Sequence, residues 1–415
     1  MSTQRPGRAV VTGIGVIAPN GLRADAYWKS VREGLGVLGR ISREGCEDLP
    51  LKVAGQVEGF DASDLIDERF LVQTDRFTHY AMAAAALALD DAGLGHDDPE
   101  EPFSIGVVTA AGSGGGEFGQ RELQKLWGQG SKFVGPYQSI AWFYAASTGQ
   151  ISIRHGFKGP CGVVASDEAG GLDSLAHAAR AVRRGTGAVV VGAAEAPLAP
   201  YSMVCQLGYP ELSTVEDPDR AYRPFTAKAC GFVPAEGGAM LVVEDEARAL
   251  DRGATVRATI AGHGATFTGA SRWKESREGL ARAIRVALDE AGCDPEEIDV
   301  VFPDALGVPE ADRAEALAIA DALGAHATRV PVTAPKTGYG RAYCGAPVLD
   351  VTAAVFAMEH GLVPPTPNVF DIDCDLDVVM SRARPAELRT ALVLSRGLMG
   401  SNAALVVRRG GGLAR

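Results

Sequence analysis

The chain contains the stretch Ala86-Leu-Ala-Leu-Asp-Asp-Ala-Gly-Leu94, which is followed by Ile105-Gly-Val-Val108. The same pattern returns as Val286-Ala-Leu-Asp-Glu-Ala-Gly-Cys293, followed by Ile298-Asp-Val-Val301. In both copies an alanine-rich stretch ends at a glycine, and an apolar run typical of a buried strand comes next. A supersecondary unit that recurs within one chain indicates duplication. The sequence therefore predicts a fold built from two similar halves.

Around these copies, apolar β-branched runs alternate with alanine-rich amphipathic stretches, which indicates an α/β fold. We expect strands at residues 9–16, 104–109, 188–192, 239–244, 256–262, 299–302 and 388–395. Helices are expected between them, at residues 77–92, 173–184, 277–291, 311–323 and 346–359. The junction between the halves is expected in the acidic, arginine-containing stretch 244–253, so one half covers 1–250 and the other 251–415.

The composition excludes several classes of function. A chain of 415 residues with 46% hydrophobic residues can bury a large core. Its formal charge of −12 argues against a nucleic-acid binder, because phosphate contacts require a basic surface. No run of eighteen apolar residues is present, and the first residues lack the apolar core of a signal peptide. The sequence predicts a cytoplasmic protein that binds neither nucleic acid nor a membrane.

The cysteines and histidines give no indication of a metal site. The seven cysteines are scattered and show no CxxC spacing, which favours reduced thiols over disulfides or zinc ligands. The seven histidines show no HxxxH or HExxH pairing. The glycine-rich stretch 112–116 lacks both the GxGxxG order and the GK[ST] ending of phosphate-binding loops. We therefore predict no bound metal and no nucleotide.

A carboxylate lies where an expected strand gives way to an expected helix, in the segment Val164-Ala-Ser-Asp-Glu-Ala-Gly-Gly-Leu-Asp-Ser174. This segment resembles the active-site turn of polyketide and fatty-acid ketosynthases, with Glu168 in the place of the cysteine nucleophile. Asp304 and Arg341 replace the two histidines of the family's Cys-His-His triad at matching positions, whereas Lys336 is retained. A carboxylate cannot form the acyl thioester that condensation requires. The resemblance therefore implies no catalytic residue for condensation.

The resemblance covers nearly the whole chain. It includes the stretches 10–21 and 223–240, while 120–127, 137–144 and 148–155 resemble chain-length factors, the non-condensing partners of type II polyketide ketosynthases. It implies a thiolase-like fold with a duplicated α-β-α-β-α architecture of five layers, made of two ketosynthase-like halves. It also implies a heterodimer with a catalytic ketosynthase. No cofactor is expected, because the substrate arrives on the phosphopantetheine of an acyl carrier protein that contacts mainly the partner.

The four matching positions predict a charge cluster that fills the vacated pocket, with Glu168 and Asp304 paired to Lys336 and Arg341. We expect the carboxylate of Glu168 to be stabilised by amides at the start of the following helix. Two other functions stay open. A malonyl-carrier-protein decarboxylase is the enzymatic alternative, because related domains with glutamine at this position resemble such enzymes, and a structural thiolase-like binding protein is the other.

The resemblance also implies a substrate tunnel at the subunit interface. The residues that match its lining are Thr109, Gly112, Ser113, Gly116, Phe133 and Met203. Aromatic-polyketide members often carry phenylalanine in place of Gly116 and tryptophan in place of Met203, so this chain departs toward smaller or more flexible side chains. Either a longer chamber results, or neighbours such as Phe118 and Phe133 refill the volume. Ser401 replaces a phenylalanine common in such factors.

Overall fold

The computed structural model describes residues 7–95, 101–269 and 273–411. Residues 1–6, which begin the amino-terminal segment assessed above for a targeting signal, lie outside this range. None of the helices in the described ranges is both long and apolar enough to cross a membrane.

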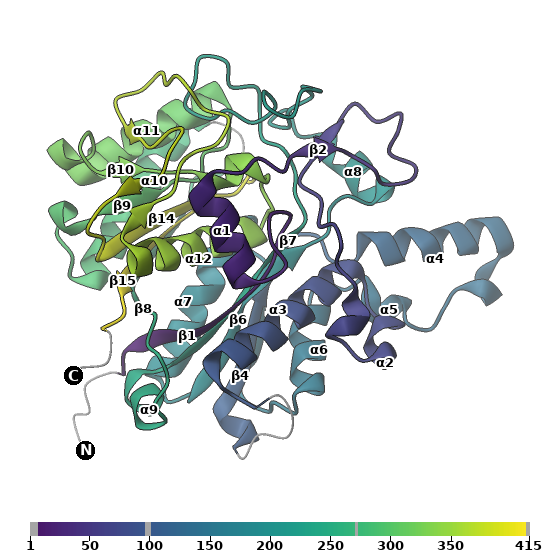
Figure 1. The fold of residues 1–415 in the computed structure, drawn as a ribbon. Coiled ribbons are helices and arrows are strands. Elements are labelled where there is room, and N and C mark those ends of the chain that lie inside the picture. Colours follow the sequence, from purple (N-terminus) through teal and green to yellow (C-terminus); the bar gives the residue numbers. More distant parts are fainter. Residues whose placement is uncertain (1–6, 96–100, 270–272, 412–415) are drawn as a thin grey trace.

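Eleven strands of the described chain form one large mixed sheet in the order β12-β10-β9-β14-β15-β8-β1-β7-β6-β4-β5 (Figure 1). Its strands are β1 (Ala9–Ile17), β4 (Ile105–Ala110), β5 (Cys161–Val164), β6 (Ala188–Glu195), β7 (Gly237–Asp245), β8 (Ala258–Phe267), β9 (Val300–Phe302), β10 (Pro331–Val332), β12 (Asp377–Val378), β14 (Thr390–Arg396) and β15 (Ser401–Arg409). Two small sheets pair β2 (Gly39–Arg40) with β3 (Val53–Ala54), and β11 (Leu362–Val363) with β13 (Arg384–Pro385).

The duplication predicted from the sequence is confirmed by the strand order. The first half runs β5-β4-β6-β7-β1 and the second runs β10-β9-β14-β15-β8, with the same succession of parallel and antiparallel pairings. The two five-stranded units join where β1 meets β8, through only two residue pairs, Val10 with Thr259 and Val11 with Ala258. The sheets of the two halves are therefore joined into one continuous sheet.

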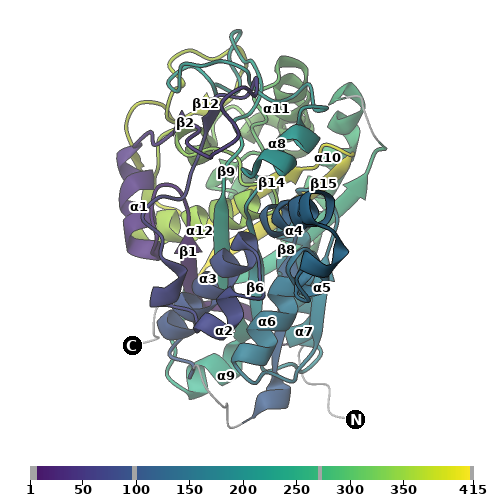
Figure 2. The same cartoon turned by 90° about the vertical axis from the view of Figure 1, so that its right-hand side faces the viewer.

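Helices cover both outer faces and fill the space between the two units (Figures 1 and 2). α3 packs on β1, β6 and β7, whereas α10 packs on β8 and β15 with α11 beside it. Between them, α7 contacts strands of both units, as does α12. The five-layered α-β-α-β-α architecture is thus confirmed. The helices are α1 (Ala24–Glu33), α2 (Glu68–Leu71), α3 (Arg76–Ala92), α4 (Gly116–Gln129), α5 (Gln138–Ala141), α6 (Ala146–Arg154), α7 (Gly170–Arg183), α8 (Pro200–Gln206), α9 (Glu246–Asp251), α10 (Trp273–Ala291), α11 (Pro309–Leu323) and α12 (Gly345–His360).

Short 3-10 turns connect several of these elements. They are η1 (Ala62–Asp64), η2 (Pro102–Ser104), η3 (Ser131–Phe133), η4 (Pro295–Glu297), η5 (Gly324–His326) and η6 (Pro335–Gly338).

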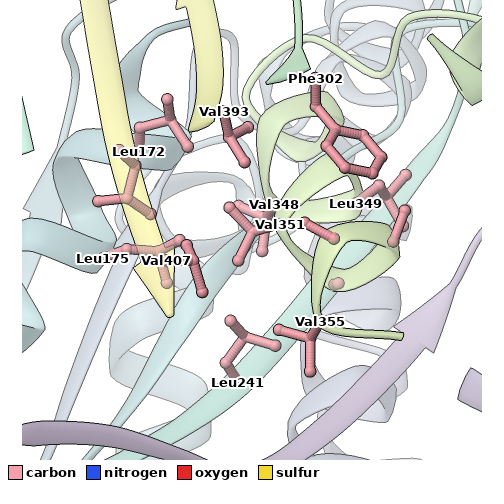
Figure 3. Close-up of a cluster of buried hydrophobic side chains, with 14 of the residues drawn as sticks. Leu172, Leu175, Leu241, Phe302, Val348, Leu349, Val351, Val355, Val393 and Val407 are labelled. Carbon is pink, nitrogen blue, oxygen red and sulfur yellow. The ribbon is translucent and has the colours of Figure 1, made fainter. Parts of the chain in front are cut away.

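The largest hydrophobic cluster lies in the middle layer and is shared by the two halves (Figure 3). Leu175 of α7 and Val351 of α12 contribute to it, together with Leu241 from the first sheet unit and Val393 from the second. α12 is apolar around almost its whole circumference, as expected for a helix with sheet on both sides. Because one core serves both halves, they form one packed body.

Each half repeats a close contact between its first strand and its outer helix. A Cβ atom at Gly15 of β1 would lie 1.9 Å from the carbonyl oxygen of Ala84 in α3. The equivalent contact in the second half places a Cβ at Gly264 of β8 2.0 Å from the carbonyl oxygen of Ala283 in α10. Only glycine permits this backbone approach. The helix therefore lies directly on the strand in both copies.

We predict that Gly15→Ala and Gly264→Ala each lower the free energy of unfolding by about 1–3 kcal/mol, because the added methyl group pushes the helix off the sheet. Urea denaturation followed by circular dichroism measures the loss. Gly128→Ala is the control: it lies in α4 with no neighbour within 4 Å of its added Cβ, and it should be neutral or slightly stabilising. Unchanged midpoints for the first two variants would contradict the close packing.

Candidate functional site

The site forms at the turn between β5 and α7. Asp167 adopts a left-handed backbone conformation with φ of 60°, which aspartate tolerates better than most residues. This sharp turn carries the chain from the strand into the helix, which begins at Gly170. The next residue, Glu168, is only 5% exposed. The turn thus places a carboxyl group inside the protein, between the two sheet units.

Glu168 is held by contacts from other segments of the chain. Its Oε2 accepts a hydrogen bond from the amide of Leu398 at 2.9 Å, and its Oε1 lies 3.5 Å from Nη1 of Arg341. Burial raises the pKa of Glu168 to about 8, and the hydrogen-bonded Asp167 carboxyl adds to this, whereas Arg341 opposes it. We expected amides at the start of the following helix to bind the Glu168 carboxyl group. The amide that binds it is that of Leu398, from a distant segment of the chain. Glu168 is therefore largely a neutral acid near pH 7.

Arg341 and Asp304 form the centre of the site. Nη2 of Arg341 donates to Oδ1 of Asp304 at 2.9 Å and to the carbonyl oxygen of Arg396 at 2.6 Å. Both side chains are at most 3% exposed. Burial acts to raise the pKa of Asp304, but the guanidinium groups of Arg341 and Arg396 hold it below its usual value. Asp304 is therefore an ionised carboxylate, where the resemblance would place a histidine.

The prediction that Lys336 pairs with the same carboxylates is wrong. Its ammonium group forms an ion pair with Asp350 of α12, and it donates to the backbone carbonyl oxygens of Pro303 and Asp304 at 2.8 and 3.1 Å. Burial raises the pKa of Asp350 to about 6. Lys336 thus holds the backbone of Asp304 in place and neutralises a different acid.

Two further charged residues, Arg396 and Glu315, belong to the network and were not expected from the sequence. Nη2 of Arg396, at the end of β14, lies 3.1 Å from Oε2 of Glu315, and its Nε lies 3.6 Å from Oδ2 of Asp304. Both carboxylate oxygens of Glu315 accept backbone amides, those of Asp304 and Ala305, at 2.7 and 2.9 Å. Glu315 and Arg396 are fully buried. The buried network therefore spans both sides of Asp304.

Neither Cys344 nor Cys161 takes over the role of a nucleophile at the turn. Cys344 is buried, its Sγ donates to the carbonyl oxygen of Asp167 at 3.1 Å, and burial raises its pKa well above the usual value. A thiol in that state is not a nucleophile. Cys161 lies on the exposed edge strand β5. Among the described residues, no group of histidine, cysteine and acidic side chains has the arrangement of a metal site.

A cavity of about 390 Å³ opens beside Glu168. Three of the residues predicted to line a tunnel border it: Gly112, Ser113 and Gly116. The other three lie elsewhere. Thr109 is buried and its hydroxyl lies 2.6 Å from that of Thr148, Met203 packs in the apolar cluster with Leu198 and Leu212, and Phe133 is 46% exposed.

The cavity is not refilled by the neighbours considered above, since neither Phe118 nor Phe133 is among its lining residues. A Cβ added at Gly116 would lie 2.0 Å from Oγ of Ser202. The start of α4 therefore abuts α8, which supplies much of the wall. The lining residues of this wall that sequence reasoning missed are Tyr201, Ser202, Cys205, Gln206 and Tyr209, together with Glu195 at the end of β6.

The fold and the turn together define a thiolase-like protein of the ketosynthase type. Family models for the beta-ketoacyl synthase N-terminal and C-terminal domains match residues 7–249 and 257–370. The chain belongs to the beta-ketoacyl synthase family.

Similar proteins include several from polyketide synthases. A Streptomyces coelicolor protein named as a polyketide beta-ketoacyl synthase 2 is 74% identical over 97% of this chain and 95% of its own length. The solved ishigamide ketosynthase/chain length factor has a TM-score of 0.88 at 28% identity, and a type II acyl carrier protein in complex with its ketosynthase has 0.85 at 26%. Both alignments cover 98% of this chain and 100% of the matched chain.

We predict that the free energy of unfolding falls as the pH rises from about 5 to about 8, and that Glu168→Gln reduces this fall. The folded protein keeps the Glu168 proton up to about pH 8, whereas the unfolded chain loses it near the ordinary pKa of 4.5. Between these values the folded state binds more protons, so a rising pH favours unfolding. Denaturant titrations across the pH range measure the slope.

Asp304→Asn is the matched comparison. It removes an ionised partner of Arg341 and Arg396, and should cost about 3–5 kcal/mol at neutral pH. Glu168→Gln keeps the shape and the charge of the neutral acid and should cost far less. Equal losses for the two variants would show that Glu168 is ionised in the folded protein.

Proposed function

We propose that this chain is the non-condensing chain-length factor of a type II polyketide synthase, which pairs with a catalytic ketosynthase and bounds the space for the growing chain. The observation that carries the proposal is the replacement of the nucleophile by Glu168, with Arg341 and Asp304 locked together behind it. The acyl carrier protein would present the substrate mainly to the partner. The proposed location is the cytoplasm, where seven free thiols stay reduced.

Condensation requires a thiolate to carry the acyl chain and hydrogen-bond donors to stabilise the thioester enolate. Glu168 provides no thiolate. At the position of the first histidine, the ionised Asp304 would repel a developing enolate oxygen. At the second, the guanidinium of Arg341 is already shared between Asp304 and the carbonyl oxygen of Arg396. The same features disfavour the decarboxylase alternative, because malonyl decarboxylation passes through an enolate as well.

An exposed edge and an exposed aromatic surface support a partner subunit. β5 ends the large sheet, and α4, α5, α6 and α8 lie on the same face of the molecule (Figure 2). Large hydrophobic side chains on or next to these helices are exposed, which is typical of an interaction surface. They are Trp127, Tyr137, Trp142, Phe143, Tyr144, Ile153, Tyr201 and Val204.

The pairing of β5 with β4 determines which backbone groups of β5 point away from the sheet. The carbonyl oxygens of Pro160 and Val164 accept the amides of Val107 and Ala111, so the backbone groups of alternate residues point toward β4. Cys161 and Val163 therefore direct their backbone N–H and C=O groups away from the sheet. An open edge of this kind is suited to pairing with a strand of another subunit.

We predict that Val163→Pro weakens assembly with a co-expressed cognate ketosynthase by tenfold or more, because it removes an outward N–H without breaking the pairing with β4. Val163→Thr keeps that N–H and should assemble normally. Affinity purification and analytical ultracentrifugation measure the complex. A wild-type chain that stays a well-folded monomer beside its ketosynthase and releases carbon dioxide from malonyl-carrier protein would instead favour the decarboxylase.

We also propose that Gly116 borders the chamber that limits chain length. Gly116→Phe should shift the products of the reconstituted complex to shorter chains, as measured by mass spectrometry, while the initial rate of malonyl consumption is retained. The added ring must displace Ser202 or enter the cavity, at about 1–3 kcal/mol if the space is tightly packed. Gly128→Phe in the same helix, with no neighbour within 4 Å, is the control. An unchanged product distribution would make Gly116 a packing residue.

A further inference from the structure

Glu195 is a second buried carboxyl group of the cavity, and the proposed function does not use it. It ends β6, is only 1% exposed, and lines the same cavity as Glu168. Its Oε1 accepts the amide of Gly112 at 2.6 Å, and its Oε2 lies 3.3 Å from the hydroxyl of Ser113. Within the described residues it takes part in no ion pair with a lysine, arginine or histidine.

The surroundings of Glu195 favour its neutral form. Burial raises its pKa to about 7, while the hydrogen bonds from the Gly112 amide and the Ser113 hydroxyl act in the opposite direction. Asp75 adds negative charge from the start of α3. The other titratable groups of the cavity are themselves acids, namely Glu168 and Asp167 at the turn, Tyr343 and Cys344 before α12, and Tyr201, Cys205 and Tyr209 around α8. No cation among the described lining residues compensates an ionised Glu195.

Neighbouring polar groups of the wall are already engaged with one another. The Tyr343 hydroxyl donates to Oε1 of Gln206, and Nε2 of Gln206 donates to the carbonyl oxygens of Pro197 and Ser202 at 2.9 Å each. The neighbours of Glu195 supply hydrogens to it. When the acid is neutral, its own O–H is a donor available to a molecule in the cavity.

We propose that Glu195 is a specificity-determining residue, whose carboxyl O–H donates a hydrogen bond to a carbonyl oxygen of the chain held in the cavity. The assignment rests on the proposed function for the identity of that chain as a polyketide. A chain with a carbonyl group at this depth gains a hydrogen bond, whereas a fully reduced chain leaves the acid without an acceptor. Above the titration range the ionised group repels the same oxygen.

The first test uses the isolated chain and nonane-4,6-dione as the probe, with nonane as the apolar reference. Ligand-observed NMR measures binding to the wild type, to Glu195→Gln and to Glu195→Met. We expect Glu195→Met to bind the dione about fivefold to tenfold more weakly. Glu195→Gln keeps an N–H donor and should stay within about twofold of the wild type. Nonane should bind Glu195→Met at least as tightly as the wild type, because the methionine has no donor left without an acceptor. Equal binding of the dione to the wild type and Glu195→Met would overturn the proposal.

The second test uses the reconstituted complex with the ketosynthase. Glu195→Met should lower the ratio of full-length to shortened product about fivefold, and Glu195→Gln should preserve it. For the wild type this ratio should fall as the pH rises through about 7, whereas Glu195→Gln should show a flat profile. The transition should persist in Glu168→Gln, which separates the two acids. A pH profile that is the same in the wild type and Glu195→Gln would also overturn the proposal.

The two proposals fail in different ways. If the wild-type chain does not assemble with a ketosynthase, the proposed function is wrong, and binding of the dione still decides the role of Glu195. If the complex extends chains normally but Glu195→Met changes neither binding nor products, the proposed function stands and Glu195 only holds the loop at Gly112.

Discussion

The site depends on the ion pair and hydrogen bonds that the guanidinium group of Arg341 makes. It pairs with Asp304 on one side, approaches Glu168 on the other, and donates to the carbonyl oxygen at Arg396. A buried cation of this kind requires compensation, and removing its ionised partner Asp304 would leave a charge in a poorly solvated interior. The three segments that supply these groups come from both halves of the duplicated chain. The ion pair therefore fixes the turn, the loop after β14 and the loop after β9 relative to one another.

The acidic groups at the turn make structural contacts and provide no nucleophile. In a condensing ketosynthase the nucleophile at this turn must be free to be acylated, whereas here the carboxyl groups of Asp167 and Glu168 hold a loop. Asp167 accepts the amide of Met399 at 2.5 Å and Glu168 accepts that of Leu398 at 2.9 Å. The loop that precedes Ser401 is thus tied to the turn by two hydrogen bonds. These two hydrogen bonds hold the turn and the loop against each other.

Much of the fold could be predicted from the sequence, because hydrophobic periodicity and the duplicated stretch are visible in short segments of the chain. Helices α3 and α10 and the strands that follow them were recognisable from the duplicated stretch, and each predicted helix and strand is present with ends shifted by a few residues. The helices α4 and α8 were missed, and the short edge strand β5 was expected before Glu168 only without bounds. β5 has only four residues, and α8 has seven with Pro200 at its start, so neither shows a clear period.

The site was predictable only where the resemblance supplied positions. Glu168, Asp304 and Arg341 do meet, but Lys336 turns to Asp350, an acid in the otherwise apolar run of α12. Arg396 and Glu315 were missed because charged residues are expected at the surface, and nothing local marks them as buried partners. Met203 was expected to line the tunnel, but it packs in the apolar cluster on one side of α8. The cavity is lined instead by Tyr201, Ser202 and Cys205 of the same helix.

The shared middle layer has a consequence for how this chain can evolve. Duplicated domains often diverge independently, since each copy keeps its own core. Here α7 from the first half and α12 from the second fill one cluster together, and each lies against strands of both copies. A change of side-chain volume in one copy must be matched in the other. The two halves must therefore change together. Recombination between β7 and β8 would combine two halves whose side chains in the shared core are not complementary.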